Sequence, residues 1–162
     1  MVVLLMGVSG AGKTAVGKLL ASQLGWEFAD ADDYHSAANV EKMRNGIPLM
    51  DADREPWLES LRAWIVAWIA AGKNGVLACS ALKKAYRDKL VAGPEVRVVY
   101  LKADRELLRE RLLGRHGHYM KEGMLESQIA TLEEPEDAII VDGGESPEEI
   151  ARQIRVQLEE SF

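Results

Sequence analysis

The chain has 162 residues, of which 48% are hydrophobic and 28% charged, a globular composition that excludes a disordered or fibrous protein. This length predicts one domain over residues 1–162, large enough to bury a core without disulfide bonds. With 26 acidic and 20 basic residues the net charge is −6, which argues against nucleic acid as a partner. The single cysteine predicts a reducing compartment and therefore a cytoplasmic location, and the longest apolar run, residues 63–71, is too short to cross a membrane.

Short apolar segments alternate along the chain with longer segments of helical periodicity. In chain order we expect strand 2–6, helix 13–24, strand 26–29, helix 56–71, strand 76–79, helix 83–91, strand 96–101, helix 104–115, strand 138–141 and a helix beginning at Pro147. The unbroken apolar run 2–6 is typical of a strand covered on both faces. The alternation predicts an α/β fold, in which a central five-stranded parallel sheet is flanked by helices in three layers.

The helix expected over residues 56–71 has the clearest pattern. Pro56 suits a first helical position, and apolar residues recur at intervals of three and four up to Gly72, which is suited to end the helix. Trp57, Trp64 and Trp68 share this spacing, so we interpret them as core residues without a ligand role.

The segment from Gly7 to Thr14 matches the phosphate-loop pattern G-x-x-x-x-G-K-[ST]. It follows an expected strand and opens an expected helix, a context that disfavours a glycine-rich turn with a chance lysine. Small residues let successive backbone N–H groups point at phosphate oxygens, while Lys13 reaches the β- and γ-phosphates and the Thr14 hydroxyl binds Mg²⁺. We therefore assign binding of a nucleoside triphosphate to Gly7, Ser9, Gly10, Ala11, Gly12, Lys13 and Thr14.

Three aspartates follow the second expected strand, where parallel sheets bind their ligands. One carboxylate, at Asp30, could hold Mg²⁺, and another, at Asp32, could accept a proton from an attacking hydroxyl. The alternative is a solvated acidic turn, which is how we interpret Asp33. Asp142, at the end of the last expected strand, is interpreted as a turn residue rather than a metal ligand.

Four more segments, residues 43–58, 79–87, 117–120 and 127–135, extend the pattern. Together with the phosphate loop and Asp30-Ala31-Asp32-x-x-His35, they closely resemble the gluconate kinases, P-loop enzymes of the shikimate-kinase and nucleoside-monophosphate-kinase type. The resemblance runs nearly end to end. It implies a P-loop kinase fold with a mobile lid, transfer of the ATP γ-phosphoryl group to the 6-hydroxyl of D-gluconate, Mg²⁺ as cofactor and a homodimer.

The resemblance also implies roles for an acceptor-binding segment at about residues 30–58 and for positions beyond it. Asp30 would lie near Mg²⁺ and Asp32 would orient or deprotonate the acceptor hydroxyl. Asp51 and Asp53 are as suited to capping the following helix as to touching substrate. Candidates for the hydroxyls and carboxylate of gluconate are His35, Arg54, Lys83 and Arg87, although a surface ion pair would also explain either arginine.

Arginines lead into a glycine-rich segment, about residues 114–124, that has the composition of a lid. Arg111 and Arg115 lie one helical turn apart, so one could stack on adenine and the other could stabilise the transferring phosphate. His118 is expected to be a lid contact to substrate. The predicted catalytic residues are Lys13, Asp32, Arg87 and Arg115.

Two other functions stay open at this point. One is a related kinase that acts on shikimate or another small hydroxy acid, and residues 46–57 argue against it. The other is a nucleotide-binding regulatory protein without catalysis. Four side chains argue against that reading, because they serve phosphoryl transfer more than binding: Lys13, Thr14, Asp32 and Arg87.

Overall fold

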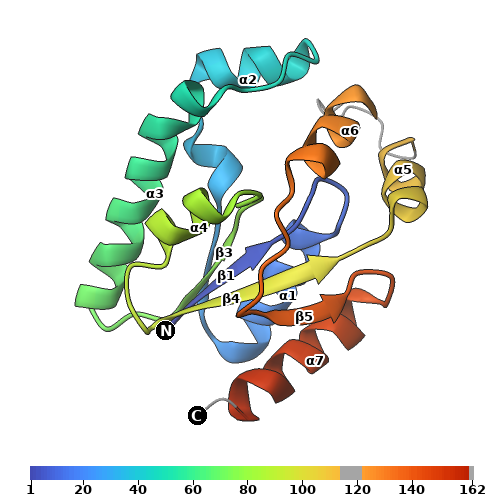
Figure 1. The fold of residues 1–162 in the computed structure, drawn as a ribbon. Helices are drawn as coiled ribbons and strands as arrows, with labels where there is room; N and C mark the ends of the chain where they lie inside the picture. The colour runs from blue at the N-terminus through green and yellow to red at the C-terminus, as the bar shows by residue number, and fades with distance from the viewer. Residues whose placement is uncertain (114–121, 161–162) are drawn as a thin grey trace.

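The computed structural model describes residues 1–113 and 122–160. Its centre is a parallel sheet of five strands in the order β2-β3-β1-β4-β5 (Figure 1). The strands are β1 (Val2–Met6), β2 (Glu27–Asp30), β3 (Gly75–Ala78), β4 (Val96–Lys102) and β5 (Ile139–Asp142). The predicted α/β class and five-stranded parallel sheet are therefore confirmed, and each strand lies within one residue of its predicted bounds at either end.

The strands are connected by helices and one 3₁₀ turn. These are α1 (Lys13–Leu24), the 3₁₀ turn η1 (Ala31–Tyr34), α2 (Ala37–Arg44), α3 (Asp51–Ala70), α4 (Lys84–Leu90), α5 (Arg105–Leu113), α6 (Glu122–Thr131) and α7 (Pro147–Glu160). Helices α3 and α4 cover one face of the sheet and α1 and α7 the other, while α2, α5 and α6 lie towards the end to which the strand arrows point (Figure 1). In the described ranges, no helix is long and apolar enough to span a bilayer.

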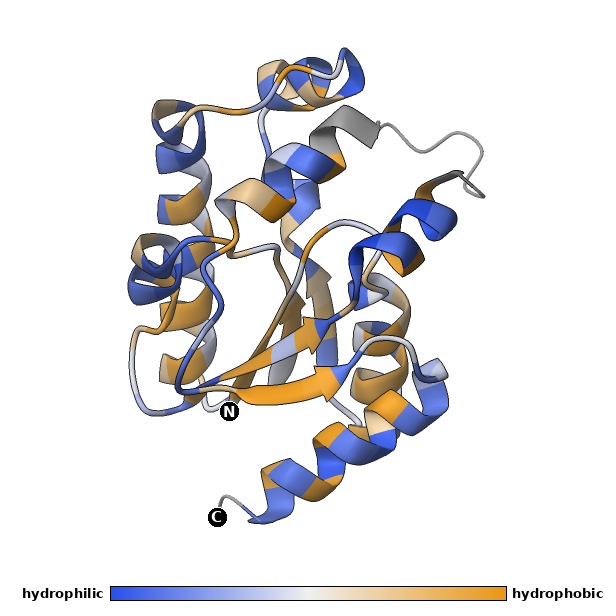
Figure 2. Cartoon of the chain, turned by 45° about the vertical axis from the view of Figure 1, so that its right-hand side comes forward, coloured by the Kyte–Doolittle hydropathy of each residue, from blue (hydrophilic) through white to orange (hydrophobic). Residues whose placement is uncertain are grey.

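Strand β1 shows why this sheet has a core on both faces. All five of its residues are fully buried. Because side chains alternate across a strand, Val3 and Leu5 pack with α1 and α7, whereas Val2, Leu4 and Met6 pack with α3 and α4. The strands are mostly orange in Figure 2, while α5 and α7 carry both colours, as helices with one buried side do.

Helix α3 corrects one prediction. It begins at Asp51, so Pro56 lies inside the helix rather than at its first position. The physical reason is the cap that was considered for Asp53: its carboxylate accepts the backbone N–H of Met50 at 2.8 Å, which starts the helix five residues earlier than expected. Trp57 is buried and Trp64 and Trp68 pack partly buried on the same cluster, so their interpretation as core residues is confirmed.

Helices α2 and α6 were not among the predicted elements. Ser36 caps α2, since its hydroxyl accepts the backbone N–H of Asn39 at 3.1 Å. Lys42 and the Asn39 amide both bond to Asp53 of α3. The sequence of α2 is short and has no clear helical periodicity. These contacts with α3 therefore stabilise the helix in place of a local pattern.

Candidate active site

A cavity opens where the carboxyl ends of β1, β2 and β3 meet the phosphate loop. It is lined by residues of that loop, of the acidic turn after β2, of α2, α3 and α6, and of the loop after β3. The predicted site residues on its wall are Ser9, Gly10, Gly12, Lys13, Thr14, Asp30, Asp32, His35 and Arg54. The fold thus brings most of the predicted nucleotide and acceptor residues to one hollow.

The phosphate loop curls as its glycines permit. Gly10 and Gly12 have φ values of 88° and 100°, in the left-handed region that other residues rarely adopt. The Lys13 ammonium group donates to the carbonyl oxygens of Gly7 and Val8, at 2.7 and 3.1 Å. The Lys13 ammonium group therefore lies against the phosphate loop, the loop that is predicted to hold the phosphates.

Gln128 of α6 holds the loop from across the cavity. Its side-chain oxygen accepts the backbone N–H of Ser9 at 2.8 Å, and its nitrogen donates to the Ser9 hydroxyl at 3.3 Å. Gln128 lines the cavity, and no role was predicted for it. The signal available in the sequence was its place within residues 127–135, one of the segments that resemble gluconate kinases.

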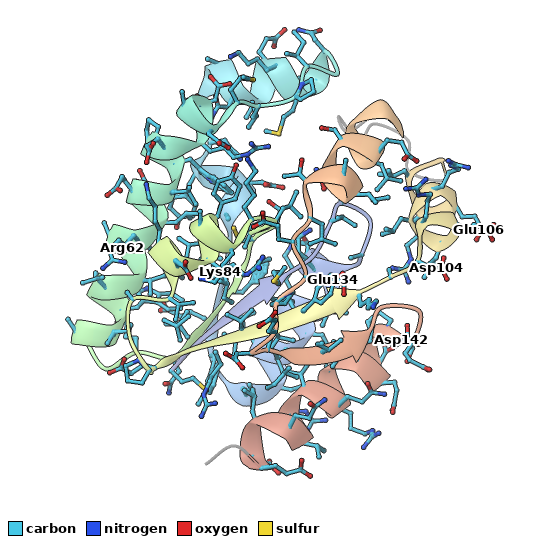
Figure 3. All side chains as sticks on the ribbon, viewed as in Figure 1. Arg62, Lys84, Asp104, Glu106, Glu134 and Asp142 are labelled. Atoms are coloured by element: carbon cyan, nitrogen blue, oxygen red, sulfur yellow. The ribbon has the colours of Figure 1, made fainter. Side chains whose placement is uncertain are left out.

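Arg111 also contacts the phosphate loop, from its outer side. One guanidinium nitrogen donates to the carbonyls of Gly10 and Ala11, at 3.0 and 3.1 Å, and another donates to that of Gly143 at 2.7 Å. The arginine therefore ties α5 both to the loop and to the turn after β5. Asp142 in that turn accepts the N–H of Gly144 at 2.8 Å, as expected of a turn residue, and lies at the end of β5 in Figure 3.

Thr14 and Asp30 form the predicted metal pair. The Thr14 hydroxyl donates to one Asp30 oxygen at 2.9 Å, and the other Asp30 oxygen accepts the backbone N–H of Asp32 at 3.0 Å. Oxygen donors are those that Mg²⁺ prefers, and it is usually bound by one or two of them together with substrate phosphates. No group of three or more His, Cys, Asp or Glu able to hold a metal occurs in residues 1–113 and 122–160.

His35 forms the acceptor-side wall with Trp57. The two rings stack with their centroids 4.1 Å apart and an interplanar angle of 14°, and the Trp57 indole N–H donates to the carbonyl of Ala31 at 2.7 Å. Burial, and secondly the guanidinium of Arg54, lower the pKa of His35 from 6.5 to about 4. His35 is therefore a neutral polar group at pH 7. Trp57, which was assigned no ligand role, lines the cavity beside it.

Arg54 is oriented by residues of α4. It donates to the Tyr86 hydroxyl at 3.1 Å, and that hydroxyl donates to the carboxylate of Asp51. Lys83 donates to the same carboxylate at 3.0 Å. These bonds, that of Tyr86 first and that of Lys83 second, lower the pKa of Asp51. Lys83, a predicted gluconate contact, is thus paired with Asp51 and is not on the cavity wall.

Arg87 is buried behind the cavity rather than on its wall. Its guanidinium donates to the carbonyls of Ala81 and Leu82, at 2.8 and 3.2 Å. Ala81 has a φ of 46°, a left-handed conformation that is strained for alanine and that these bonds help to hold. Arg87 therefore supports the loop after β3, of which Leu82 lines the cavity. Arg115 and His118, and most of the predicted lid at about 114–124, lie outside the described residues.

Comparison with known proteins places this site in a family. A family model described as an AAA domain matches residues 2–135. A mouse protein named probable gluconokinase is 48% identical over 152 residues, which cover 83% of each chain. The gluconokinase of Gluconobacter oxydans is 44% identical over 92% of this chain and 86% of its own. The crystal structure of a gluconokinase from Sinorhizobium meliloti matches with a TM-score of 0.87 and 37% identity, covering 98% of this chain and 91% of that one. The chain belongs to the gluconokinase family.

Proposed function

We propose that this protein transfers the γ-phosphoryl group of ATP to the 6-hydroxyl of D-gluconate, giving 6-phosphogluconate and ADP. The observation that carries the proposal is one cavity lined by the phosphate loop, through Lys13 and Thr14, and by the acceptor-side groups Asp32, His35 and Arg54. A kinase requires this arrangement because the attacking oxygen must lie in line with the transferred phosphate. The names of the relatives support gluconate as the acceptor.

In the proposed reaction the oxygen of the 6-hydroxyl attacks the γ-phosphorus while the bond from that phosphorus to the ADP oxygen breaks. Asp32 orients the hydroxyl and takes its proton. Lys13 exchanges its carbonyl partners for the β- and γ-phosphates, and Arg54 offers its fork to the gluconate carboxylate. Mg²⁺, with Thr14 and Asp30 as protein ligands, supplies positive charge at the phosphate oxygens when bound.

Several finer assignments belong to the same proposal. Arg115 is proposed as catalytic, His118 as a substrate contact and residues 114–124 as a lid. The predicted roles of Arg87 in catalysis and of Lys83 at the substrate require each side chain to leave its present partners, the loop carbonyls for Arg87 and Asp51 for Lys83. Arg111 is proposed to serve the nucleotide site, which its bonds to the phosphate loop support. From the single cysteine we further propose a cytoplasmic location, without nucleic acid or membrane partners. From the family resemblance we propose a homodimer, and sedimentation of the purified protein would test this oligomeric state.

The substrate is tested by ADP release, followed by a coupled assay with ATP and Mg²⁺. Gluconate, other sugar acids, shikimate and AMP would each be offered as acceptor. We expect turnover with gluconate, and nuclear magnetic resonance of the product should place the new phosphate on the 6-oxygen. Turnover of shikimate or AMP without turnover of gluconate would overturn the proposal.

The role of Asp32 is tested against its neighbour Asp33, which is also exposed but is expected to be a solvated residue. Asp32→Asn should lower kcat by about 100-fold or more, the usual contribution of a general base, while Asp33→Asn should stay within about twofold of the wild type. Lys13→Ala should also reduce kcat by orders of magnitude with the fold retained, as circular dichroism would check. Near wild-type turnover of Asp32→Asn would rule out its role as base.

A further inference from the structure

Asn39 is a buried polar residue close to the acceptor side of the cavity, and the reaction outlined above gives it no role. It is only 6% exposed, and it lies in the first turn of α2, four positions after His35. A buried amide must have its hydrogen-bonding groups satisfied, so the partners of Asn39 are informative about its neighbours.

The first partner fixes how the Asn39 amide is turned. Its terminal nitrogen lies 2.8 Å from the backbone carbonyl of Asp53. A carbonyl oxygen only accepts hydrogen bonds, so the amide atom that faces it must be the NH₂ group and not the oxygen. One of the two amide hydrogens is used in this bond.

The second partner fixes the protonation of His35. The same amide nitrogen lies 3.3 Å from Nδ1 of the His35 ring. Because the amide nitrogen can only donate, Nδ1 must supply a lone pair, and a neutral ring then carries its proton on Nε2. The stacking of His35 on Trp57 holds the plane of the ring, and His35 lines the cavity.

We propose that Asn39 is a positioning residue that keeps His35 as the neutral tautomer protonated on Nε2, so that His35 donates a hydrogen bond to an oxygen of the acceptor substrate. The proposal rests on the proposed function for the identity of that acceptor. A ring in this state has no free lone pair to take the proton of the attacking hydroxyl, which leaves that task to Asp32.

Two further observations support a neutral donor at this place. Burial against Trp57 and the nearby charge of Arg54 both lower the pKa of His35, so the ring stays uncharged at pH 7. Arg54 lines the same cavity, and its guanidinium supplies a positive charge there. An oxygen-rich acid fits such a pair, because its carboxylate can bind the guanidinium while a hydroxyl or carboxylate oxygen accepts from the imidazole.

The first test reads the tautomer directly, in the wild-type protein without substrate. The chain has three histidines, so long-range ¹H–¹⁵N spectra of the labelled protein contain three ring patterns, and that of His35 is the one lost in His35→Gln. We expect the pattern of a neutral ring protonated on Nε2, unchanged between pH 7 and pH 5. A ring protonated on Nδ1, or charged at pH 7, would overturn the proposal even if gluconate is the substrate.

The second test changes the donor and uses another asparagine as the matched control. Asn39→Asp replaces the donating group by an acceptor, so we expect the His35 proton to move to Nδ1 and the KM for gluconate to rise about tenfold, with the KM for ATP within about twofold. Asn74→Asp should leave both constants within about twofold, because Asn74 lies before β3 and bonds to the chain's amino group.

An Asn39→Asp protein with the wild-type tautomer, or with an unchanged KM for gluconate, would refute the positioning role. If this variant does not fold, the wild-type spectrum still decides the tautomer. Absence of gluconate turnover in the wild type would instead refute the proposed function and leave the spectroscopic result in force.

Discussion

Acidification should destabilise the folded protein through His35. The pKa of this residue is about 4 in the folded state, lowered by burial and then by Arg54, and 6.5 is its ordinary value in an unfolded chain. Between pH 6.5 and pH 4, His35 is therefore mostly protonated in the unfolded state and mostly neutral in the folded state. The stability that depends on a neutral His35 is present above pH 6.5 and is lost as the pH falls from 6.5 towards 4.

The magnitude follows from the two pKa values. The full difference corresponds to about 3 kcal/mol, of which about 2 kcal/mol is lost by pH 5. Other groups also titrate in this range, so the effect is isolated by comparison with His35→Gln, which cannot take up the proton. Between pH 7 and pH 5 the wild type should lose about 2 kcal/mol more of its free energy of unfolding than the variant does.

Urea denaturation followed by tryptophan fluorescence, at pH 7 and at pH 5, measures this difference. The slope of the free energy of unfolding against urea concentration should be the same for the two proteins. A difference in the midpoint then reports a change in stability and not in the denatured state. Equal losses in the wild type and in His35→Gln would show that His35 takes up its proton as readily in the folded as in the unfolded protein, and the account of its burial would be wrong.

Three further changes test other parts of the structure. Arg111→Met removes the charged hydrogen bonds to the phosphate loop, so kinetics should show a rise of about tenfold in the KM for ATP with little change in that for gluconate; an unchanged KM for ATP would contradict this. Leu61→Ala, at a fully buried site, should cost about 2–5 kcal/mol in urea denaturation, against about 0.5 kcal/mol or less for the exposed Val66→Ala, and equal costs would contradict the packing of α3. Cys79 is buried and its pKa is raised to about 12, mainly by burial, so mass spectrometry should find it unmodified by iodoacetamide at pH 8 in the folded protein but modified in urea.

The sequence predicted the sheet well because the signals for its strands are local. The apolar run of β1 is continuous since both faces of that strand are covered, and a chain segment shows this directly. Helix α2 is different. It is held to α3 by Asn39 in its first turn and Lys42 in its last, which both bond to Asp53, 14 and 11 positions further along the chain. No local pattern encodes such contacts.

The candidate site divides in the same way. Residues with a fixed place in a motif, such as Lys13 and Thr14, lie where their spacing predicted, because the loop that carries them is itself the motif. Gln128 lies 119 positions from Ser9, and Asn39, only four positions from His35, is turned by the backbone carbonyl of Asp53, 14 positions away. Their roles depend on the hydrogen-bonding groups that the fold places next to them. These neighbours are visible only in the folded chain.

Arg111 contacts the phosphate loop although it does not line the cavity. Its guanidinium binds the carbonyl oxygens of Gly10 and Ala11 from the outer side of the loop. In a planar trans peptide the C=O and the following N–H point in opposite directions. A guanidinium that holds the Ala11 carbonyl outwards therefore turns the N–H of Gly12 inwards, towards the cavity that Gly12 lines. Replacing Arg111 should thus disturb the direction of the loop's donors as well as the local charge, which is why its loss is expected in the KM for ATP.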